Sequence, residues 1–313
     1  MCVPHVSAAT FEVEPVRKGL AVHRRGIVMH KTWRWSASGA DFILPHEEIQ
    51  KICVHAGMAG IEGMPSLFPS QEASALEEIA ASYRAAGLEF DSFHLPLGPE
   101  NDISSFYETH REEAVAISQH WMECAAALGC RVVIQHPTTS RCNAEVEGLD
   151  RYITQMGKSL ATLLPMAAGL NLTVAIENLP PGERGGRFSA RPEHFERMIA
   201  EFAGPNLGFC LDTGHALMAG GPERAHDFLD VMAPHMAAFH LADNAGDRDS
   251  HLAPGHGSVD WGPVFRKGAQ IEHSHTMCIE TPPFAPGNHP SYSLDAWKQM
   301  ILGTEALVDA ALS

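Results

Sequence analysis

Short apolar segments alternate with longer amphipathic segments along most of the chain. The apolar segments are nearly uninterrupted and are bounded by Gly, Pro or polar residues, which is typical of buried strands. The longer segments have helical spacing of their apolar residues and often end at a glycine, which favours helices. The pattern predicts strands at 25–30, 60–63, 89–94, 131–136, 172–177, 207–212, 236–241 and 275–280. It predicts helices from 45 onward, at 70–86, 104–128, 149–168, 192–202 and 222–232, near 261, and at 293–312.

Strands that are apolar throughout and alternate with helices favour a parallel sheet covered by helices on its outer side. Eight such units within 313 residues favour an α/β fold of the (β/α)8 TIM barrel type. We expect a single barrel domain over residues 24–313, preceded by an N-terminal arm at 1–23. An open doubly wound sheet is the alternative, but no GxGxxG turn follows the first expected strand.

Six consecutive expected strands end in a residue type that binds metals. These residues are His94, His136, Glu177, Asp212 (with His215 three positions later), His240 and Glu280. Each one alone would more often be a structural hydrogen-bonding residue, but their recurrence at one position of successive strands points to a common site. In a TIM barrel the carboxyl ends of the strands meet at one face, where active sites are built.

Glu177, Asp212, His240 and Glu280 provide three carboxylates and one imidazole. This oxygen-rich set suits a hard or borderline divalent ion, such as Mn²⁺, Zn²⁺, Mg²⁺ or Co²⁺. Three neighbouring carboxylates also repel one another, and a divalent cation would remove that conflict. The sequence therefore predicts a metal site at this end of the barrel.

Two loops carry further candidate residues. Asp249 and His251 are two positions apart in a polar loop and would face one direction in an extended chain, although a solvated loop is the alternative. The Gly/Pro-rich loop after the fifth strand carries Arg184 and Arg187, which could contact an anionic or polyhydroxyl substrate or could simply be solvated. Weaker candidates for substrate contact are Arg248 and Trp33. The single Asp-Thr-Gly at 212–214 resembles the turn of aspartic proteases, but that interpretation leaves the other strand-end residues unexplained.

The composition of the chain argues against several classes of protein. A formal charge of −16 argues against passive binding to nucleic acid, which needs clustered Lys and Arg. The seven cysteines are scattered without any CxxC pair, which fits neither a disulfide framework nor a cysteine-based zinc site. The first residues lack the apolar core of a signal peptide, and no stretch reaches the roughly 20 apolar residues of a membrane span. We expect a cytoplasmic enzyme with no membrane partner.

The stretches 93–96, 133–137, 175–178, 208–215, 239–244, 249–251 and 278–281 carry a resemblance to a known group of proteins. With them the chain resembles the xylose-isomerase-like TIM barrel superfamily, which contains sugar and sugar phosphate isomerases and epimerases and also endonuclease IV. The resemblance implies one ion, often Mn²⁺, held by Glu177, Asp212, His240 and Glu280. It further implies that Glu177 and Glu280 move a proton beside a carbonyl through an enediolate, and that His215 holds a substrate hydroxyl.

On this resemblance we expect a metal-dependent isomerase or epimerase of carbohydrate metabolism that acts on a small carbohydrate. Barrels of this kind often form homo-oligomers, but no stretch of the sequence indicates one. The endonuclease IV alternative implies a three-zinc phosphodiesterase, with ligands at His94, His136, Glu177, Asp212, His215, His240, Asp249, His251 and Glu280. The acidic charge and the absence of a recognisable DNA-binding loop at 62–69 favour sugar chemistry. A related lyase acting on keto-glycosides is a third hypothesis, because abstraction of a proton beside a ketone also starts β-elimination. A non-enzymatic binding barrel is the fourth.

Overall fold

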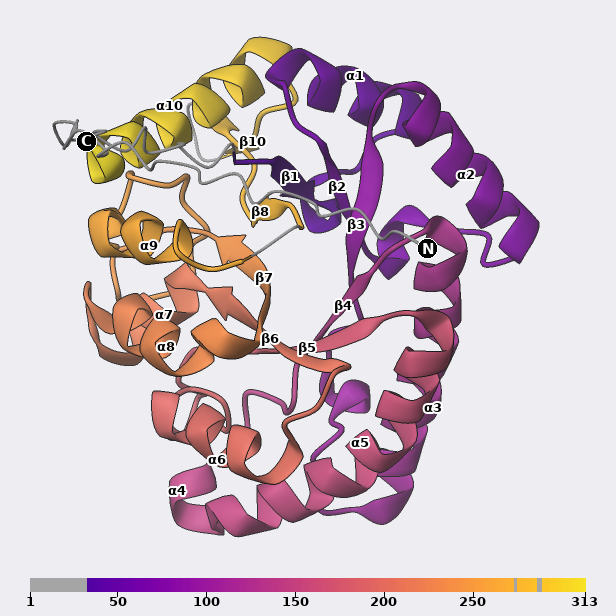
Figure 1. Cartoon of the computed structure of the whole chain (residues 1–313), viewed down its shortest axis with the longest axis vertical. Coiled ribbons are helices and arrows are strands. Elements are labelled where there is room, and N and C mark those ends of the chain that lie inside the picture. Colours follow the sequence, from indigo (N-terminus) through magenta and orange to yellow (C-terminus); the bar gives the residue numbers. More distant parts are fainter. Residues whose placement is uncertain (1–32, 273–274, 286–288) are drawn as a thin grey trace, which may run out of the picture. The chain divides into compact units, whose positions relative to one another are not determined.

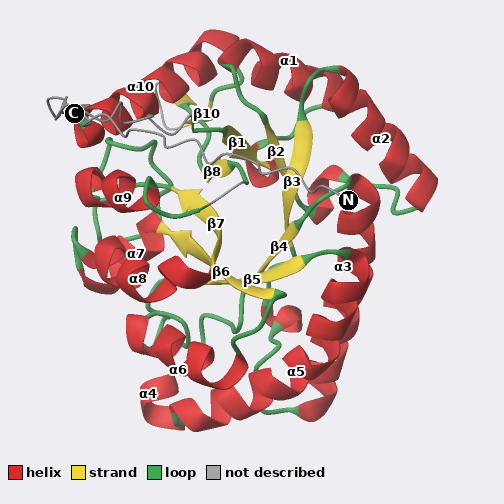
Figure 2. Ribbon diagram, viewed as in Figure 1, coloured by secondary structure: helices red, strands yellow, loops and turns green. Residues whose placement is uncertain are grey.

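Eight parallel strands close into a barrel in the order in which they occur along the chain (Figures 1 and 2). The structure, a computed structural model, describes residues 33–272, 275–285 and 289–313. The barrel strands are β1 (Trp35–Ser38), β2 (Gly60–Gly63), β3 (Glu89–His94), β4 (Val132–Gln135), β5 (Thr173–Glu177), β6 (Leu207–Asp212), β7 (Met236–Leu241) and β8 (Met277–Ile279). The predicted (β/α)8 barrel is confirmed.

The helices lie around the outside of this barrel (Figure 2). They are α1 (His46–Ala56), α2 (Ala73–Ala85), α3 (Glu108–Leu128), α4 (Ala144–Glu147), α5 (Leu149–Leu170), α6 (Pro192–Phe202), α7 (Thr213–Gly220), α8 (Arg224–Met232), α9 (Trp261–Gly268) and α10 (Leu294–Leu312). A small antiparallel pair, β9 (Phe284–Ala285) and β10 (His289–Pro290), precedes the last helix. None of the helices in the described ranges is long and apolar enough to cross a membrane.

Seven of the predicted strands agree with the structure to within two residues, and the first does not. The first barrel strand is β1, ten residues after the start of the expected strand at 25–30. That expected strand and the expected arm at 1–23 lie outside the described residues. The prediction also missed the short helices α4 and α7. Helix α7 begins directly at the end of β6. Gly214 lies in its first turn, and because glycine is unfavourable in helices, the sequence did not indicate a helix there.

The apolar core lies mainly between the strands and the helices, where large side chains such as Tyr83, Tyr152, Phe195 and Trp297 are fully buried. A smaller cluster of modest side chains from β4 to β7 is formed by Val132, Ile134, Ala175, Cys210, Ala237 and Ala238. Buried polar side chains come from all but one of the eight barrel strands; among them are Ser38, Glu62, His94, Glu177, Asp212 and His240. Burying such groups costs free energy unless they find partners, so the carboxyl ends of the strands are where a functional site is expected.

Candidate metal centre

Four of the predicted metal ligands converge at the carboxyl ends of β5 to β8. One ligand atom from each of Glu177, Asp212, His240 and Glu280 lies within 4.8 Å of the corresponding atoms of the other three. The register of the sheet explains part of this, because Asp212 and His240 are direct partners on the neighbouring strands β6 and β7. Glu177 ends β5, and Glu280 follows β8 directly. The structure therefore brings together the residues that the strand-end pattern selected.

Each of these four residues also has one buried polar atom without a hydrogen-bond partner among the described residues. The atoms are Glu177 Oε1, Asp212 Oδ2, His240 Nδ1 and Glu280 Oε2. His240 Nδ1 lies 3.2 Å from Glu280 Oε2 and 3.5 Å from Glu177 Oε1. Leaving a buried polar atom unsatisfied costs about 1–3 kcal/mol, and one divalent cation would satisfy all four together. The residues present therefore fit a divalent metal ion.

The sequence around Asp212 explains why only one of its oxygens is free. Asp212 is the N-cap of α7, and its Oδ1 accepts a 2.6 Å hydrogen bond from the backbone N–H of His215. Asp is among the favoured N-cap residues. Asn178 fixes the backbone of Asp212, donating from Nδ2 to its carbonyl at 2.8 Å and accepting from its N–H at 2.7 Å. Oδ2 is thus held in place at the centre without being bonded itself.

Glu62 is a buried carboxylate that the sequence analysis missed. It lies on β2 and is 1 % exposed. The Ser92 hydroxyl donates to its Oε2 at 2.7 Å, and His240 Nε2 lies 3.2 Å from the same oxygen. A histidine that binds a metal through one nitrogen commonly donates its other N–H to a carboxylate. Glu62 therefore orients His240 so that Nδ1 faces Glu177 and Glu280.

Asp41 is a second missed carboxylate, in the turn after β1. Its Oδ2 is buried and has no hydrogen-bond partner in the described ranges. Burial raises the pKa of Asp41 well above its usual range, and the charges of Glu280 and Glu62 raise it further. The strand-end pattern did not indicate it, because the first strand was predicted at 25–30, outside the described residues, and β1 was not predicted.

A second group of ligand-type residues consists of His215, Asp249 and His251, with one atom from each within 4.8 Å of the others. Asp249 Oδ2 lies 3.1 Å from His215 Nε2 and 3.2 Å from His251 Nε2. His215 also borders the first group, because its Nδ1 is 3.2 Å from Glu177 Oε1. The predicted pairing of Asp249 with His251 is thus present, and both face His215.

The loop that carries Asp249 and His251 is anchored by Asp243. This carboxylate accepts hydrogen bonds from the backbone N–H groups of Gly255 and Val259 and from the indole N–H of Trp261. His251 has a positive φ of 43°, a strained conformation for a residue other than glycine. Its Nδ1 lies 2.6 Å from the carbonyl oxygen of Glu280. The loop is therefore fixed against the strand end rather than simply solvated.

A third group is formed by His94, His136 and Glu177. The Nε2 atoms of His94 and His136 lie 3.4 Å and 3.0 Å from Glu177 Oε2. Glu177 consequently uses one oxygen toward this group, while its other oxygen faces the central four residues. All three groups share Glu177 as a neighbour and form one continuous polar centre.

Burial and neighbouring charges shift the pKa values of the residues in this centre. Burial raises the pKa of Asp212 to about 8, and the charges of Glu280 and Glu177 add to the effect although His215 opposes it. Burial alone would lower the pKa of His240, but Cys210 and the surrounding carboxylates raise it well above the usual range. Burial would raise the pKa of Glu177, yet His136 and His240 hold it well below the usual range. A divalent cation would displace protons from His240 and Asp212.

The four weaker candidates for substrate contact lie in different places. Trp33 precedes β1 and packs against Trp35 and Phe265, so the structure does not bring it to the carboxyl ends of the strands. Arg248 is exposed on its loop. Arg184 pairs with Glu147 at 3.6 Å and is mostly exposed.

Arg187 is the exception among these candidates. It is buried, and together with His136 it lines a cavity of about 230 Å³.

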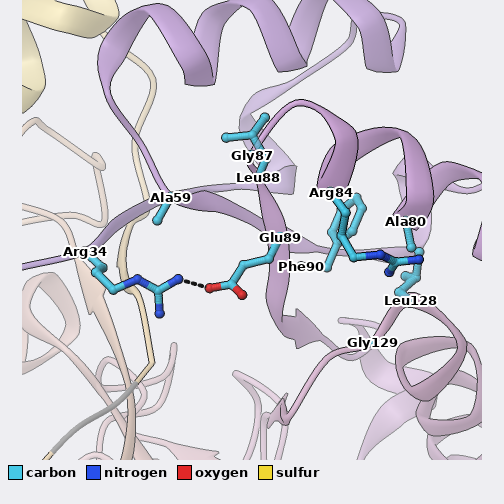
Figure 3. A pocket seen from close by; sticks show the side chains of 10 residues that line it. All are labelled: Arg34, Ala59, Ala80, Arg84, Gly87, Leu88, Glu89, Phe90, Leu128 and Gly129. Atoms are coloured by element: carbon cyan, nitrogen blue, oxygen red, sulfur yellow. Dashed lines mark hydrogen bonds and ion pairs between the residues drawn. The ribbon is translucent and has the colours of Figure 1, made fainter.

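A larger cavity of about 450 Å³ lies at the opposite end of the barrel, and Figure 3 shows the residues that line it. It is lined by residues that precede or begin β1, β2 and β3, including Arg34, Ala59 and Glu89. Arg34 and Glu89 form an ion pair there. None of the predicted site residues lines this cavity.

Fold and centre together define a class: a (β/α)8 barrel that gathers carboxylates and imidazoles at the carboxyl ends of its strands. The chain belongs to the xylose isomerase-like TIM barrel family, whose family model matches residues 51–300. The resemblance noted in the sequence is thereby confirmed.

The chain is also similar to a relative of known sequence and to solved structures of the same fold. An uncharacterized protein of Sinorhizobium fredii, y4fM, is 25 % identical over 276 residues, covering 86 % of this chain and 82 % of the relative. A D-tagatose 3-epimerase-like protein has a TM-score of 0.72 at 21 % identity, covering 90 % of this chain and 100 % of its own. The 3-keto-D-glucoside 4-epimerase YcjR of E. coli has a TM-score of 0.71 at 17 % identity, covering 88 % and 100 %. The IOLI protein, solved with a zinc atom, has a TM-score of 0.69 at 14 % identity, covering 90 % and 98 %.

Proposed function

We propose that this protein is a divalent-metal-dependent isomerase or epimerase of a small sugar or sugar phosphate. The observation that carries the proposal is the set of four unsatisfied buried ligand atoms on Glu177, Asp212, His240 and Glu280. The sugar epimerases among the similar structures support the same class of reaction. We propose Mn²⁺ or Zn²⁺ as the ion, with Mg²⁺ and Co²⁺ as the other hard or borderline ions that suit this donor set.

A bound divalent ion would supply positive charge to the substrate carbonyl oxygen and to the enediolate that forms on loss of the neighbouring proton. The chain supplies the acid and the base. Glu280 has its pKa held below the usual range; burial opposes this, but His240 and His251 outweigh burial. The carboxylate is therefore ionised, which is the form that a base needs. Its side chain is 12 % exposed, against 1 % for Glu177. We assign proton transfer on the two faces of the substrate carbon to Glu280 and Glu177.

The direct test is incubation of the purified protein with a panel of ketoses in D₂O, with Mn²⁺, Co²⁺, Mg²⁺ or Zn²⁺ added separately. An isomerase or epimerase incorporates deuterium at the carbon beside the carbonyl, which ¹H NMR detects even when little product accumulates. The expected result is exchange that depends on the added ion. Absence of exchange with all ketoses and ions tested would contradict the proposal.

A second candidate function is phosphodiester hydrolysis by a multi-zinc centre. The observation that favours it is the presence of two further ligand-type groups, His215 with Asp249 and His251, and His94 with His136 and Glu177. The Asp249→Ala variant separates the two functions. With a single essential ion it retains most of the exchange activity, whereas a multi-zinc enzyme loses bound zinc and cleavage of abasic DNA together.

A lyase acting on keto-glycosides would use the same first proton transfer and differ in the second step. Loss of a substituent from the enediolate would give an unsaturated product in place of an epimer. The D₂O assay distinguishes the two reactions, because elimination forms a product with a new vinylic proton signal. We favour the epimerase class because the similar structures named above include sugar epimerases.

A further inference from the structure

The cavity beside His136 has the features of a binding site for an anion. It has a volume of about 230 Å³ and is lined by Pro96–Pro99, Asn101, His136, Thr138–Ser140 and Arg187. These residues come from the loops that follow β3, β4 and β5, on the same side of the barrel as the metal centre. We propose that this cavity binds an anionic terminal group of the substrate, a phosphate or a carboxylate. This inference rests on the proposed function, since it assigns the far end of a sugar whose reacting carbons lie at the metal centre.

Arg187 is a buried cation for which the described residues supply no ion-pair partner. It is 8 % exposed, its Nη2 donates to the carbonyl oxygen of Thr138 at 2.9 Å, and its Nε is buried without a hydrogen-bond partner in the described part of the chain. Arg184, three positions earlier, pairs with Glu147, whereas Arg187 takes part in no ion pair with a described residue. Burying an unpaired charge is costly, and a planar guanidinium with free donors suits phosphate or carboxylate oxygens.

The carboxylates whose charges act on this guanidinium are Glu177, Asp102 and Asp249, and all three are engaged elsewhere. Glu177 Oε2 lies 3.0 Å from His136 Nε2, and Asp249 Oδ2 lies 3.1 Å from His215 Nε2. Asp102 has other partners as well. It accepts a hydrogen bond from the backbone N–H of Ser104 at 3.0 Å, and the Cys142 thiol lies 3.7 Å from its other oxygen. Burial raises the pKa of Asp102 to about 6, against the opposing effects of these contacts and of Arg187. Asp102 therefore influences Arg187 through space without occupying its donors.

His136 joins the cavity to the metal centre. Its ring lines the cavity, and its Nε2 lies 3.0 Å from Glu177 Oε2. Asn101, which also lines the cavity, has a buried Oδ1 without a partner among the described residues, which can accept a hydrogen bond from a sugar hydroxyl. The cavity thus offers one charged donor and one acceptor next to the proposed acid–base residue, which suits a hydroxylated chain with a charged end.

The test compares three ketoses that differ only at the sixth carbon: D-fructose, D-fructose 6-phosphate and D-fructuronate. Their dissociation constants are measured by isothermal titration calorimetry on the metal-loaded full chain, with inorganic phosphate as a fourth probe. The variants are Arg187→Gln, which removes the charge, and Thr139→Asp, which adds a negative charge to the cavity wall. Arg197→Gln is the matched control, because Arg197 lies on the exposed face of α6.

The expected result is that wild type binds at least one of the two anionic ketoses at least tenfold more tightly than D-fructose. Arg187→Gln and Thr139→Asp each reduce that preference to less than about twofold, and Arg197→Gln leaves it unchanged. If Arg187→Gln does not fold, the anion preference of Thr139→Asp alone tests the inference. Equal binding of the charged and neutral ketoses, an undiminished preference in Thr139→Asp, or no binding of any anion including inorganic phosphate would overturn the inference. Anion preference without deuterium exchange would leave the inference intact and contradict the proposed function.

Discussion

Two buried aspartates at opposite ends of the barrel differ in their hydrogen-bond partners and in their pKa values. Asp91, near the amino end of β3, accepts hydrogen bonds from Arg131 Nε at 3.0 Å and from the backbone N–H of Thr276 at 2.6 Å, and lies 3.1 Å from His275 Nδ1. Burial opposes its ionisation, but these partners lower the pKa of Asp91 to about 2. Burial raises the pKa of Asp212, at the carboxyl end of β6, to about 8, and its Oδ2 has no hydrogen-bond partner among the described residues.

The comparison shows which end of the barrel serves stability and which serves a ligand. At the amino end the protein itself supplies the partners of the buried charge, so the ionised form stabilises the fold. At the carboxyl end the same residue type is held in position by Asn178 and the start of α7, yet one oxygen is left without a partner. A fold tolerates this cost where a bound group completes the site, and the group that we propose here is a divalent cation.

The largest effect is expected from Glu280→Gln, which removes the proposed base while keeping its shape. We expect turnover to fall about a thousandfold, because a positioned general base contributes roughly 10²–10⁴-fold. Circular dichroism should show an unchanged fold. The matched control is Glu196→Gln on the exposed side of α6, which should keep full activity. Wild-type activity in Glu280→Gln would contradict the assignment of the base.

Asp91→Asn should affect stability and leave the metal centre intact. We expect a loss of about 3 kcal/mol in the free energy of unfolding, because a buried charge pair loses one partner, with unchanged metal content. Asp212→Asn is the matched substitution at the other end. It should leave the stability of the metal-free protein unchanged or higher and abolish metal binding. Similar losses of unfolding free energy for Asp91→Asn and Asp212→Asn, measured by urea titration of the metal-free protein, would contradict the proposed difference between the two ends of the barrel.

Glu62→Gln should weaken metal binding although Glu62 is not one of the four central residues. The amide can donate to His240 Nε2, which would move the imidazole proton to Nδ1 and block the nitrogen that faces Glu177 and Glu280. We expect metal affinity to fall about 10–100-fold, as for other residues that orient metal ligands, measured by competition with a chelator. Glu89→Gln, which removes the partner of Arg34 at the amino end, should leave that affinity unchanged.

Metal affinity should increase with pH across the neutral range. The pKa of Asp212 is raised to about 8 and that of His240 is raised well above the usual range in the metal-free protein. Both must lose protons to bind an ion, so protons compete with the metal as pH falls. We expect affinity to rise about tenfold or more per unit between pH 6 and pH 8. A flat profile in calorimetric titrations would show that these two groups are already deprotonated without metal.

The sequence indicated those parts of the centre that depend on strand periodicity. Glu177, Asp212 and His240 each close an apolar strand, and parallel strands bring their carboxyl ends to one face. The pairing of Asp249 with His251 was predicted from their spacing, and the structure places both next to His215. The seven strands found at their expected positions rest on the same alternation.

The remaining parts depend on contacts between distant segments that no local pattern encodes. Glu62 is the third residue of a Gly-Ile-Glu-Gly strand. The pairing of β2 with β3 brings it to Ser92, and closure of the barrel brings it to His240 on β7. Asp41 was missed because the first strand was placed at 25–30, outside the described residues. Trp33 was selected by residue type, but it stacks on Trp35 and makes an edge-to-face contact with Phe265, which keeps it at the amino end.

The most direct test of the metal centre is the metal content of the protein purified without added metal or chelator, measured by elemental analysis and followed by titration with Mn²⁺ and Zn²⁺. We predict about one divalent ion per chain, or stoichiometric uptake on titration, that is lost in Asp212→Asn and retained in Asp91→Asn. Two to three zinc ions per chain would favour the phosphodiesterase. A wild-type protein that holds no divalent ion and takes none up would contradict the central claim.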